Sequence, residues 1–115
     1  MLRGEIRLVD LDPARVGEGN KRRPAVLVSN DGANTTAAKL GRGVVTVIPI
    51  TTNVDRVYPF QVLIPADESR LERDSKARAE QVRSVSVERV TDRIGTVPPE
   101  VMLEVDEALR LHLAL

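Results

Sequence analysis

Short apolar runs and alternating apolar and polar residues dominate the chain, and this pattern predicts a protein built mainly from β-strands. Residues 5–11 alternate with a period of two, as a strand does. Residues 25–29 and 43–50 are rich in β-branched side chains and are typical of central strands, although Pro49 predicts an edge or a bulge near the end of the second. Further strands are expected at 60–64, around 76–79 within the charged segment 68–80, and at 93–97 after residues 81–85.

Two helices are expected beside these strands. Thr35 is a suitable N-cap for a short helix through Leu40, with Gly41 at its end. Residues 98–100 (PPE) suit the first turn of a terminal helix that runs to about Leu113. Residues 17–21 are interpreted as a loop. The expected fold is mainly β: a small, strongly bent antiparallel sheet or barrel with a C-terminal helix packed on it, forming one domain over residues 1–115.

Composition and charge narrow the function classes. The 115 residues carry 17 basic and 17 acidic side chains, so bulk charge does not favour a simple polyanion binder. Residues 1–50 nevertheless hold eight basic and five acidic side chains, which allows a locally basic surface near residues 21–23. No apolar run approaches a membrane span or a signal peptide, so a cytoplasmic protein with no membrane contact is expected.

The sequence contains few residues or motifs that are typical of a metal site or a cofactor site. The chain has no cysteine and a single histidine, His112, which is expected to be packed or at the rim of the terminal helix. The acidic residues of the loops lack the spacing of a calcium loop, and no P-loop, G-x-G-x-x-G or G-x-S-x-G motif occurs. We therefore expect neither a metal site nor a cofactor.

Two segments carry more polar chemistry than packing requires. In the first, Lys21, Arg22 and Arg23 lead through Pro24 into an apolar strand. In the second, residues 49–53 (PITTN) leave a strand with three small polar side chains. The first segment suits a solubilising strand edge, and the second suits a turn that satisfies its own backbone. Together, a guanidinium and a hydroxyl at strand ends would also suit a phosphate. The residues alone leave both interpretations open.

A family resemblance adds to this pattern. The chain resembles the MazF/PemK toxin–antitoxin endoribonucleases, or mRNA interferases, over nearly its whole length. The resemblance is carried in family order by Gly4-Glu5-Ile6, Val9-Asp10-Leu11-Asp12-Pro13, Gly17-Glu18, 21–29 (KRRPAVLVS), 47–52 (VIPITT), Tyr58-Pro59-Phe60, Asp74-Ser75, 80–85 (EQVRSV) and Arg89. Arg7 departs from the tryptophan that many members have there, which affects packing or dimer details rather than the catalytic pair.

The resemblance implies a fold, a reaction and partners. It implies an SH3-like twisted antiparallel barrel of the CcdB/Kid/MazF type, working as a homodimer. It also implies sequence-specific cleavage of single-stranded RNA, which blocks translation and growth, and inhibition by a cognate antitoxin, a MazE-like acidic and partly disordered peptide. Arg23 and Thr51 occupy the family's catalytic positions, and Glu18 matches an acidic residue implicated in some members. The positions expected to contact RNA are Asn20, Lys21, Arg22, Thr52, Gln81 and Arg83.

The chemistry of RNA cleavage agrees with this assignment. If the 2′-hydroxyl attacks the adjacent phosphorus, the reaction needs a base, an acid and a stabiliser of phosphorane charge, but no metal. Arg23 suits the stabiliser because its guanidinium stays charged, and Glu18 is the rival base. Two alternatives remain open at this point: a non-enzymatic toxin of the same fold, like the CcdB gyrase poisons, and an inactive RNA-binding homologue. The chain ends Leu113-Ala114-Leu115 rather than in the Trp-Gly-Ile of CcdB proteins.

Overall fold

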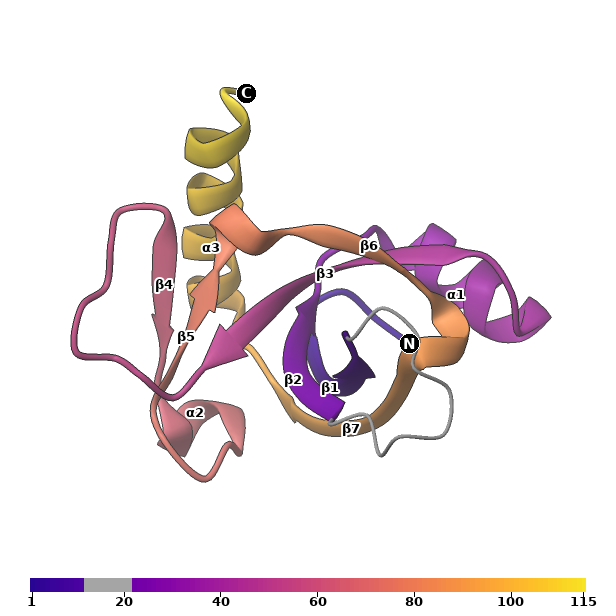
Figure 1. The fold of residues 1–115 in the computed structure, drawn as a ribbon, viewed down its shortest axis with the longest axis horizontal. Coiled ribbons are helices and arrows are strands. Elements are labelled where there is room, and N and C mark those ends of the chain that lie inside the picture. Colours follow the sequence, from indigo (N-terminus) through magenta and orange to yellow (C-terminus); the bar gives the residue numbers. More distant parts are fainter. Residues whose placement is uncertain (12–21) are drawn as a thin grey trace.

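A bent antiparallel sheet of seven strands forms the body of the molecule. The structure, a computed structural model, describes residues 1–11 and 22–115. The strands follow the order β4-β5-β3-β2-β1-β7, and β6 pairs with β3 away from this path. Figure 1 shows β1, β2, β3, β6 and β7 curling around one another, with β4 and β5 to one side and α3 standing behind them. The strands are β1 Glu5–Asp10, β2 Arg22–Leu27, β3 Val44–Thr51, β4 Gln61–Ile64, β5 Ser75–Arg78, β6 Arg83–Ser86 and β7 Val90–Thr96.

Strand β3 is shared by the two parts of the sheet. Its first half pairs with β6 from Val44 to Val47, and its end pairs with β5 at Ile50 and Thr51. Pro49 lies between these two stretches and is opposite Ala25 of β2 on the other side. Proline has no N–H to donate, so this change of partner is a place where it fits. In place of the edge or bulge predicted at Pro49, the structure has a change of strand partner: β3 continues through Pro49 to Thr51, and its register with β2 is regular.

Two buried clusters occupy opposite faces of the sheet, because successive side chains of a strand point in opposite directions. One cluster includes Ala25, Leu27, Val45 and Val47, and it also contains residues of β1 and β6. The other cluster lies on the apolar face, which we define by Val26, Ile48, Ile50, Val62 and Ala77. Helix α3 (Pro99–Leu113) packs on this apolar face through Val101, Val105 and Ala108.

The helices differ in detail from the sequence-based expectation. Helix α1 runs from Asp31 to Leu40, one turn longer than predicted, because Asn30 rather than Thr35 is its N-cap. The side chain of Asn30 accepts a hydrogen bond from the backbone N–H of Ala33 at 2.8 Å. Gly41 ends the helix in the left-handed conformation, as predicted. A short helix, α2 (Ala66–Ser69), was not expected, and it overlaps the start of the charged segment 68–80.

Strand and helix ends also shift. β2 begins at Arg22 and not at residue 25, because β1 continues to pair with it through Val9–Arg23 and Asp10–Arg22. β7 begins at Val90, three residues early, and follows β1 through two register shifts. α3 has the predicted bounds, but Leu113 is exposed because the end of the helix extends past the sheet (Figure 1). The loop predicted at 17–21 lies outside the described residues. No helix in the described part of the chain is long and apolar enough to cross a membrane.

Candidate active site

The strand register gathers polar side chains on the face opposite α3. In the β2–β3 pair, Leu27 is opposite Val47 and Ala25 is opposite Pro49. Two residues further along both strands are Arg23 and Thr51, so both belong to the same face and the same end of this pair. Thr51 is in turn opposite Lys76 of β5, and Arg78 of β5 is opposite Gln61 of β4. We call the surface formed by Arg23, Thr51, Lys76, Arg78 and Gln61 the polar face.

Arg23 has its backbone fixed while its side chain is exposed. Its backbone pairs with Val9 of β1, which anchors the strand at this point. Arg22 is also exposed, but the alternation of β2 turns it to the opposite side of the sheet. Arg22 and Arg23, which are adjacent in the sequence, are therefore not equivalent in space. Of these two, Arg23 shares a face with Thr51.

Thr51 is half-buried at the end of β3, and its hydroxyl oxygen accepts a hydrogen bond from the backbone N–H of Asn53 at 3.3 Å. This contact leaves the hydroxyl proton available to another acceptor. Thr52, the next residue, lines a cavity together with Pro24 and Ile50. It therefore lies on the other side of the sheet from Thr51.

Of the remaining predicted residues, Arg83 has a defined contact. It pairs with Val47 of β3, and its Nη1 donates a hydrogen bond to the carbonyl oxygen of Leu11 at 2.9 Å. Leu11 immediately precedes the segment that contains Glu18, Asn20 and Lys21, and these three predicted site residues lie outside the described residues. Gln81 is exposed at the end of a 3-10 turn, Ala79–Gln81.

Sequence reasoning missed two cations of the polar face, Lys76 and Arg78. Lys76 is only 8% exposed, and its Nζ donates a hydrogen bond to the carbonyl oxygen of Arg56 at 2.5 Å. Nε of Arg78 is buried without a hydrogen-bond partner in the described part of the chain. The signal was the period of two in residues 75–78 (SKAR), where small side chains alternate with cations. Small residues on one face and cations on the other indicate a strand with one packed and one functional side.

Carboxyl and amide groups complete the far side of the polar face. Nε2 of Gln61 donates to Oε2 of Glu80 at 2.6 Å, and Oε1 of Gln61 accepts from the backbone N–H of Tyr58 at 3.2 Å. The other carboxylate oxygen of Glu80 is buried and has no partner among the described residues. Across residues 1–11 and 22–115, no group of three His, Asp or Glu side chains is arranged to hold a metal ion.

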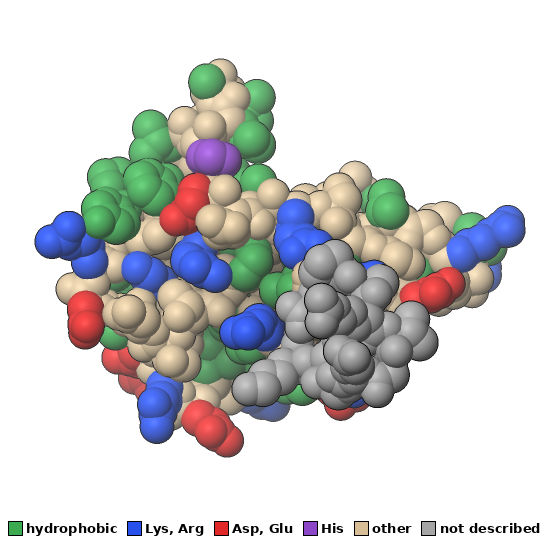
Figure 2. All heavy atoms as spheres, viewed as in Figure 1, with side chains coloured by type: hydrophobic (Ala, Val, Ile, Leu, Met, Phe, Trp, Pro, Cys, Tyr) green, Lys and Arg blue, Asp and Glu red, His purple; other side chains and the backbone are tan. Residues whose placement is uncertain are grey.

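The surface around this region is rich in positive charge. In Figure 2, several Lys and Arg side chains gather across the middle of the view, over β3 and β5. Acidic side chains in that view are scattered, at the lower left and bottom, beside the histidine and at the right. A neutral protein therefore presents a locally basic surface, but its cations on β5, Lys76 and Arg78, come from the half of the sequence with more acidic than basic residues and not from residues 1–50.

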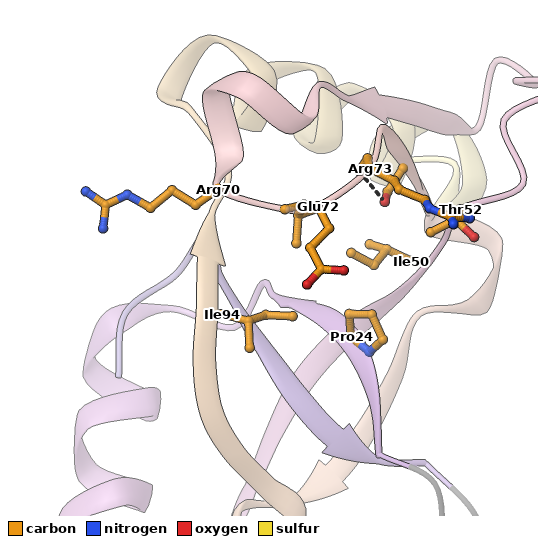
Figure 3. Close-up of a pocket in the computed structure, with 9 residues that line it drawn as sticks. Pro24, Ile50, Thr52, Arg70, Glu72, Arg73 and Ile94 are labelled. Atoms are coloured by element: carbon orange, nitrogen blue, oxygen red, sulfur yellow. Dashed lines mark hydrogen bonds between the residues drawn. The ribbon is translucent and has the colours of Figure 1, made fainter.

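A separate cavity of about 450 Å³ opens on the other side of β2 and β3. Figure 3 shows Pro24 and Ile50 facing it from the strands and the carboxylate of Glu72 pointing into it, while Arg70 points away. Helix α2 comes close to β7 here because Gly95 has no side chain: a Cβ at this position would lie 2.4 Å from the carbonyl oxygen of Ser69. This cavity and the polar face are opposite sides of the same strands.

Comparisons with known proteins agree over the whole chain. A family model described as "PemK-like, MazF-like toxin of type II toxin-antitoxin system" matches residues 2–113. The chain is 57% identical to endoribonuclease MazF9 of Mycobacterium tuberculosis over 115 residues, covering 100% of this chain and 98% of that protein. It is 34% identical to endoribonuclease EndoA of Bacillus subtilis over 114 residues, covering 98% and 94%.

A solved structure shows the same fold. It is an endoribonuclease in complex with its cognate antitoxin from a mycobacterial species, and it superposes with a TM-score of 0.77 at 26% identity. The match covers 100% of this chain and 96% of that one. The mainly β architecture with a C-terminal helix, expected from the sequence, is thereby confirmed.

Proposed function

The chain belongs to the PemK-like, MazF-like family of type II toxin–antitoxin toxins, and on this premise we propose that it is a toxin that cleaves single-stranded RNA at specific sequences. Membership confirms the resemblance drawn from the motifs. The observation that carries the reaction is the strand register that places Arg23 and Thr51 on one face. Both groups can then act on one phosphate.

The proposed reaction uses Arg23 and Thr51 of the polar face together with Glu18, which lies outside the described residues. The 2′-hydroxyl of the substrate loses its proton to a base and attacks the adjacent phosphorus, and the bond from phosphorus to the 5′-oxygen breaks as that oxygen gains a proton. The products are a 2′,3′-cyclic phosphate and a 5′-hydroxyl. Arg23 stabilises the extra negative charge of the phosphorane through its planar fork, and the Thr51 hydroxyl donates a hydrogen bond. Glu18 is the proposed base, because the guanidinium of Arg23 remains protonated.

No metal is needed in this scheme, since the attacking oxygen belongs to the RNA and does not have to be generated from water. Residues around Arg23 and Thr51 would bind the RNA on either side of the scissile bond. Arg83, whose Nη1 holds the carbonyl oxygen of Leu11, is proposed to contact RNA, as are Asn20 and Lys21, which lie outside the described residues. Arg22 and Thr52 lie on the other side of the sheet, where they would contact RNA that passes over its edge.

The proposed assembly is a cytoplasmic homodimer controlled by an antitoxin. Large apolar side chains remain exposed on the single chain, among them Val44, Leu103 and Leu111, and an interface between two copies would cover such groups. A relative of the same fold was solved in complex with its cognate antitoxin. For this chain we propose a MazE-like acidic, partly disordered peptide that competes with RNA for the basic surface.

The test is cleavage of a long RNA by the purified protein in EDTA. Discrete fragments with cyclic phosphate ends are expected. An oligonucleotide that carries 2′-deoxyribose only at the scissile nucleotide should bind but resist cleavage, because the nucleophile is missing. Normal cleavage of this oligonucleotide would replace the proposed mechanism with a hydrolytic one, and a protein that cuts no RNA would be a non-enzymatic toxin or a binding module.

A further inference from the structure

Lys76 is a buried cation without an anionic partner among the described residues. It lies in the middle of the sheet on β5, between β3 and β4, and 8% of its surface is exposed. Its ammonium donates to the carbonyl oxygen of Arg56 in the loop between β3 and β4. Among the described residues, no carboxylate forms an ion pair with it.

Such a group is costly for a folded protein. An ammonium has three N–H donors, and the carbonyl of Arg56 accounts for one of them. Removing an unpaired charge from water costs several kcal/mol in proteins, and a neutral carbonyl returns only part of it. The buried carboxylate of Glu5 shows the usual solution, since it is bound by both Nε and Nη2 of Arg7. Residues 1–11 and 22–115 give Lys76 no equivalent partner, so a bound anion would complete its environment.

The position of Lys76 indicates which anion this is. Its backbone is opposite Thr51 on one side and Leu63 on the other, so its side chain stands on the polar face directly beside Thr51. Arg23 stands on the other side of Thr51, on β2. β3 lies between β2 and β5, and paired strands are about 4.8 Å apart, so two strand spacings, about 10 Å, are expected between the lines of β2 and β5. This row is wide enough for two phosphates of an extended strand.

We propose that Lys76 forms a second phosphate site of the polar face, which binds the non-scissile phosphate next to the one held by Arg23. The inference rests on the proposed cleavage of RNA. The carbonyl of Arg56 fixes the direction of the ammonium, and the remaining N–H donors form charge-assisted hydrogen bonds to the phosphate. Lys76 thereby sets the register of the RNA relative to Thr51.

The experiment combines a protein variant with a substrate variant. The RNA is an oligonucleotide of the cleaved sequence with 2′-deoxyribose at the scissile nucleotide, and neutral methylphosphonates replace its phosphates one at a time. Affinity is measured for the wild-type protein, K76M, K76R and the control K39M, which removes an exposed lysine of α1. K76M should bind the unmodified oligonucleotide about 10-fold or more weakly, and the slope of log affinity against log salt should fall by about one. K76R should retain most of the affinity, and K39M all of it.

The decisive result is whether the effects of K76M and of a methylphosphonate on RNA affinity depend on each other. One methylphosphonate next to the scissile position should weaken binding to the wild-type protein and have no further effect on K76M. If K76M loses the same affinity at every methylphosphonate position, or loses only thermal stability, Lys76 is a structural residue and the inference is wrong.

The wild-type protein alone gives a second test, should K76M fail to fold. Its methylphosphonate scan must show two adjacent sensitive phosphates, and a single sensitive phosphate would overturn the second site. These outcomes are distinct from failure of the proposed function, because in that case the wild-type protein cleaves no RNA at all.

Discussion

The polar face and the apolar face are made from alternate residues of the same strands, yet their side chains have opposite environments. Arg23, Thr51 and Lys76 stand on one side of β2, β3 and β5. Their chain neighbours Ile50 and Ala77 are buried on the other side, in the cluster that also contains the inner residues of α3. Adjacent residues of one strand therefore belong to different faces, one with the polar side chains of the site and one with the buried core. Substitutions at neighbouring positions should therefore affect either RNA cleavage or the free energy of unfolding.

The largest effect is expected on the apolar face. Ile50 is 6% exposed and packs in the buried cluster, so I50A should lower the free energy of unfolding by about 2–5 kcal/mol. Denaturant unfolding followed by circular dichroism measures this loss. At a temperature where the variant is still folded, RNA cleavage should remain within a few-fold of the wild-type rate. A cleavage rate as low as that of an Arg23 variant would show that the two faces are not independent.

The polar face should give the converse result. R23K keeps the positive charge but loses the bidentate fork, so the single-turnover rate of RNA cleavage should fall by about 100-fold or more. The free energy of unfolding should change little, because the side chain is exposed. RNA affinity should fall much less than the rate, since other cations still contribute to binding.

The matched control is R22K, one residue earlier and on the opposite side of the strand. It should leave the cleavage rate nearly unchanged. Equal losses from R22K and R23K would mean that these arginines serve only as a general positive surface. An unaffected R23K enzyme would exclude Arg23 from the active site.

Thr51 should show a smaller loss than Arg23. T51V removes the hydroxyl donor but keeps the shape of the side chain, and loss of one hydrogen bond to a charged group should slow cleavage by about 10-fold. T51S restores the hydroxyl and should recover most of the rate in the same single-turnover assay. If T51V cleaves as fast as the wild type, the row of Arg23 and Lys76 acts without a hydroxyl between them.

The smallest effect on stability is expected at Glu5, a buried carboxylate that is bound by Arg7. Burial raises the pKa of the Glu5 carboxyl. The hydrogen bonds and charge of Arg7, a backbone hydrogen bond from Leu2 and the N-terminal charge lower this pKa by more than burial raises it. The pKa of Glu5 therefore lies below its usual value. Because the folded state lowers this pKa, Glu5 stabilises the protein at neutral pH, and this contribution disappears as the pH falls through the folded-state pKa.

E5Q should therefore cost about 1 kcal/mol or less at pH 7. The difference from the wild type should shrink at acidic pH, as measured by urea unfolding across the acid range. A difference that grows on acidification would reverse the sign of the pKa shift.

The periodic apolar pattern predicted much of the fold. The central strands and the terminal helix emerge from local sequence because each has a strong period and clear end signals. The strand ends were less predictable. Arg22 and Arg23 belong to β2 because β1 happens to continue opposite them, and this depends on pairing between distant segments.

The site was only partly predictable for the same reason. Arg23 and Thr51 emerged from the family motifs, whereas their common face follows from the register of β2 and β3. Lys76 looked like an ordinary charge in a polar segment, because burial in the middle of a sheet is a property of the assembled strands. The division of residues 22 and 23 between two sides, and of Thr51 and Thr52, also required the structure.

The exchange of partners along β3 has a consequence for how such sequences can diverge. Side chains alternate along β3, so the number of residues between a given residue and the positions that pair with β2, β6 and β5 decides which face its side chain is on. An insertion or deletion of one residue between Val47 and Thr51 would reverse the faces beyond it, bringing an aliphatic side chain to the phosphate and a hydroxyl to the core. Evolution can therefore change the residues of this strand, but changes of length are confined to the loops. New RNA specificities should arise by lengthening or shortening those loops, with the count along β3 held constant.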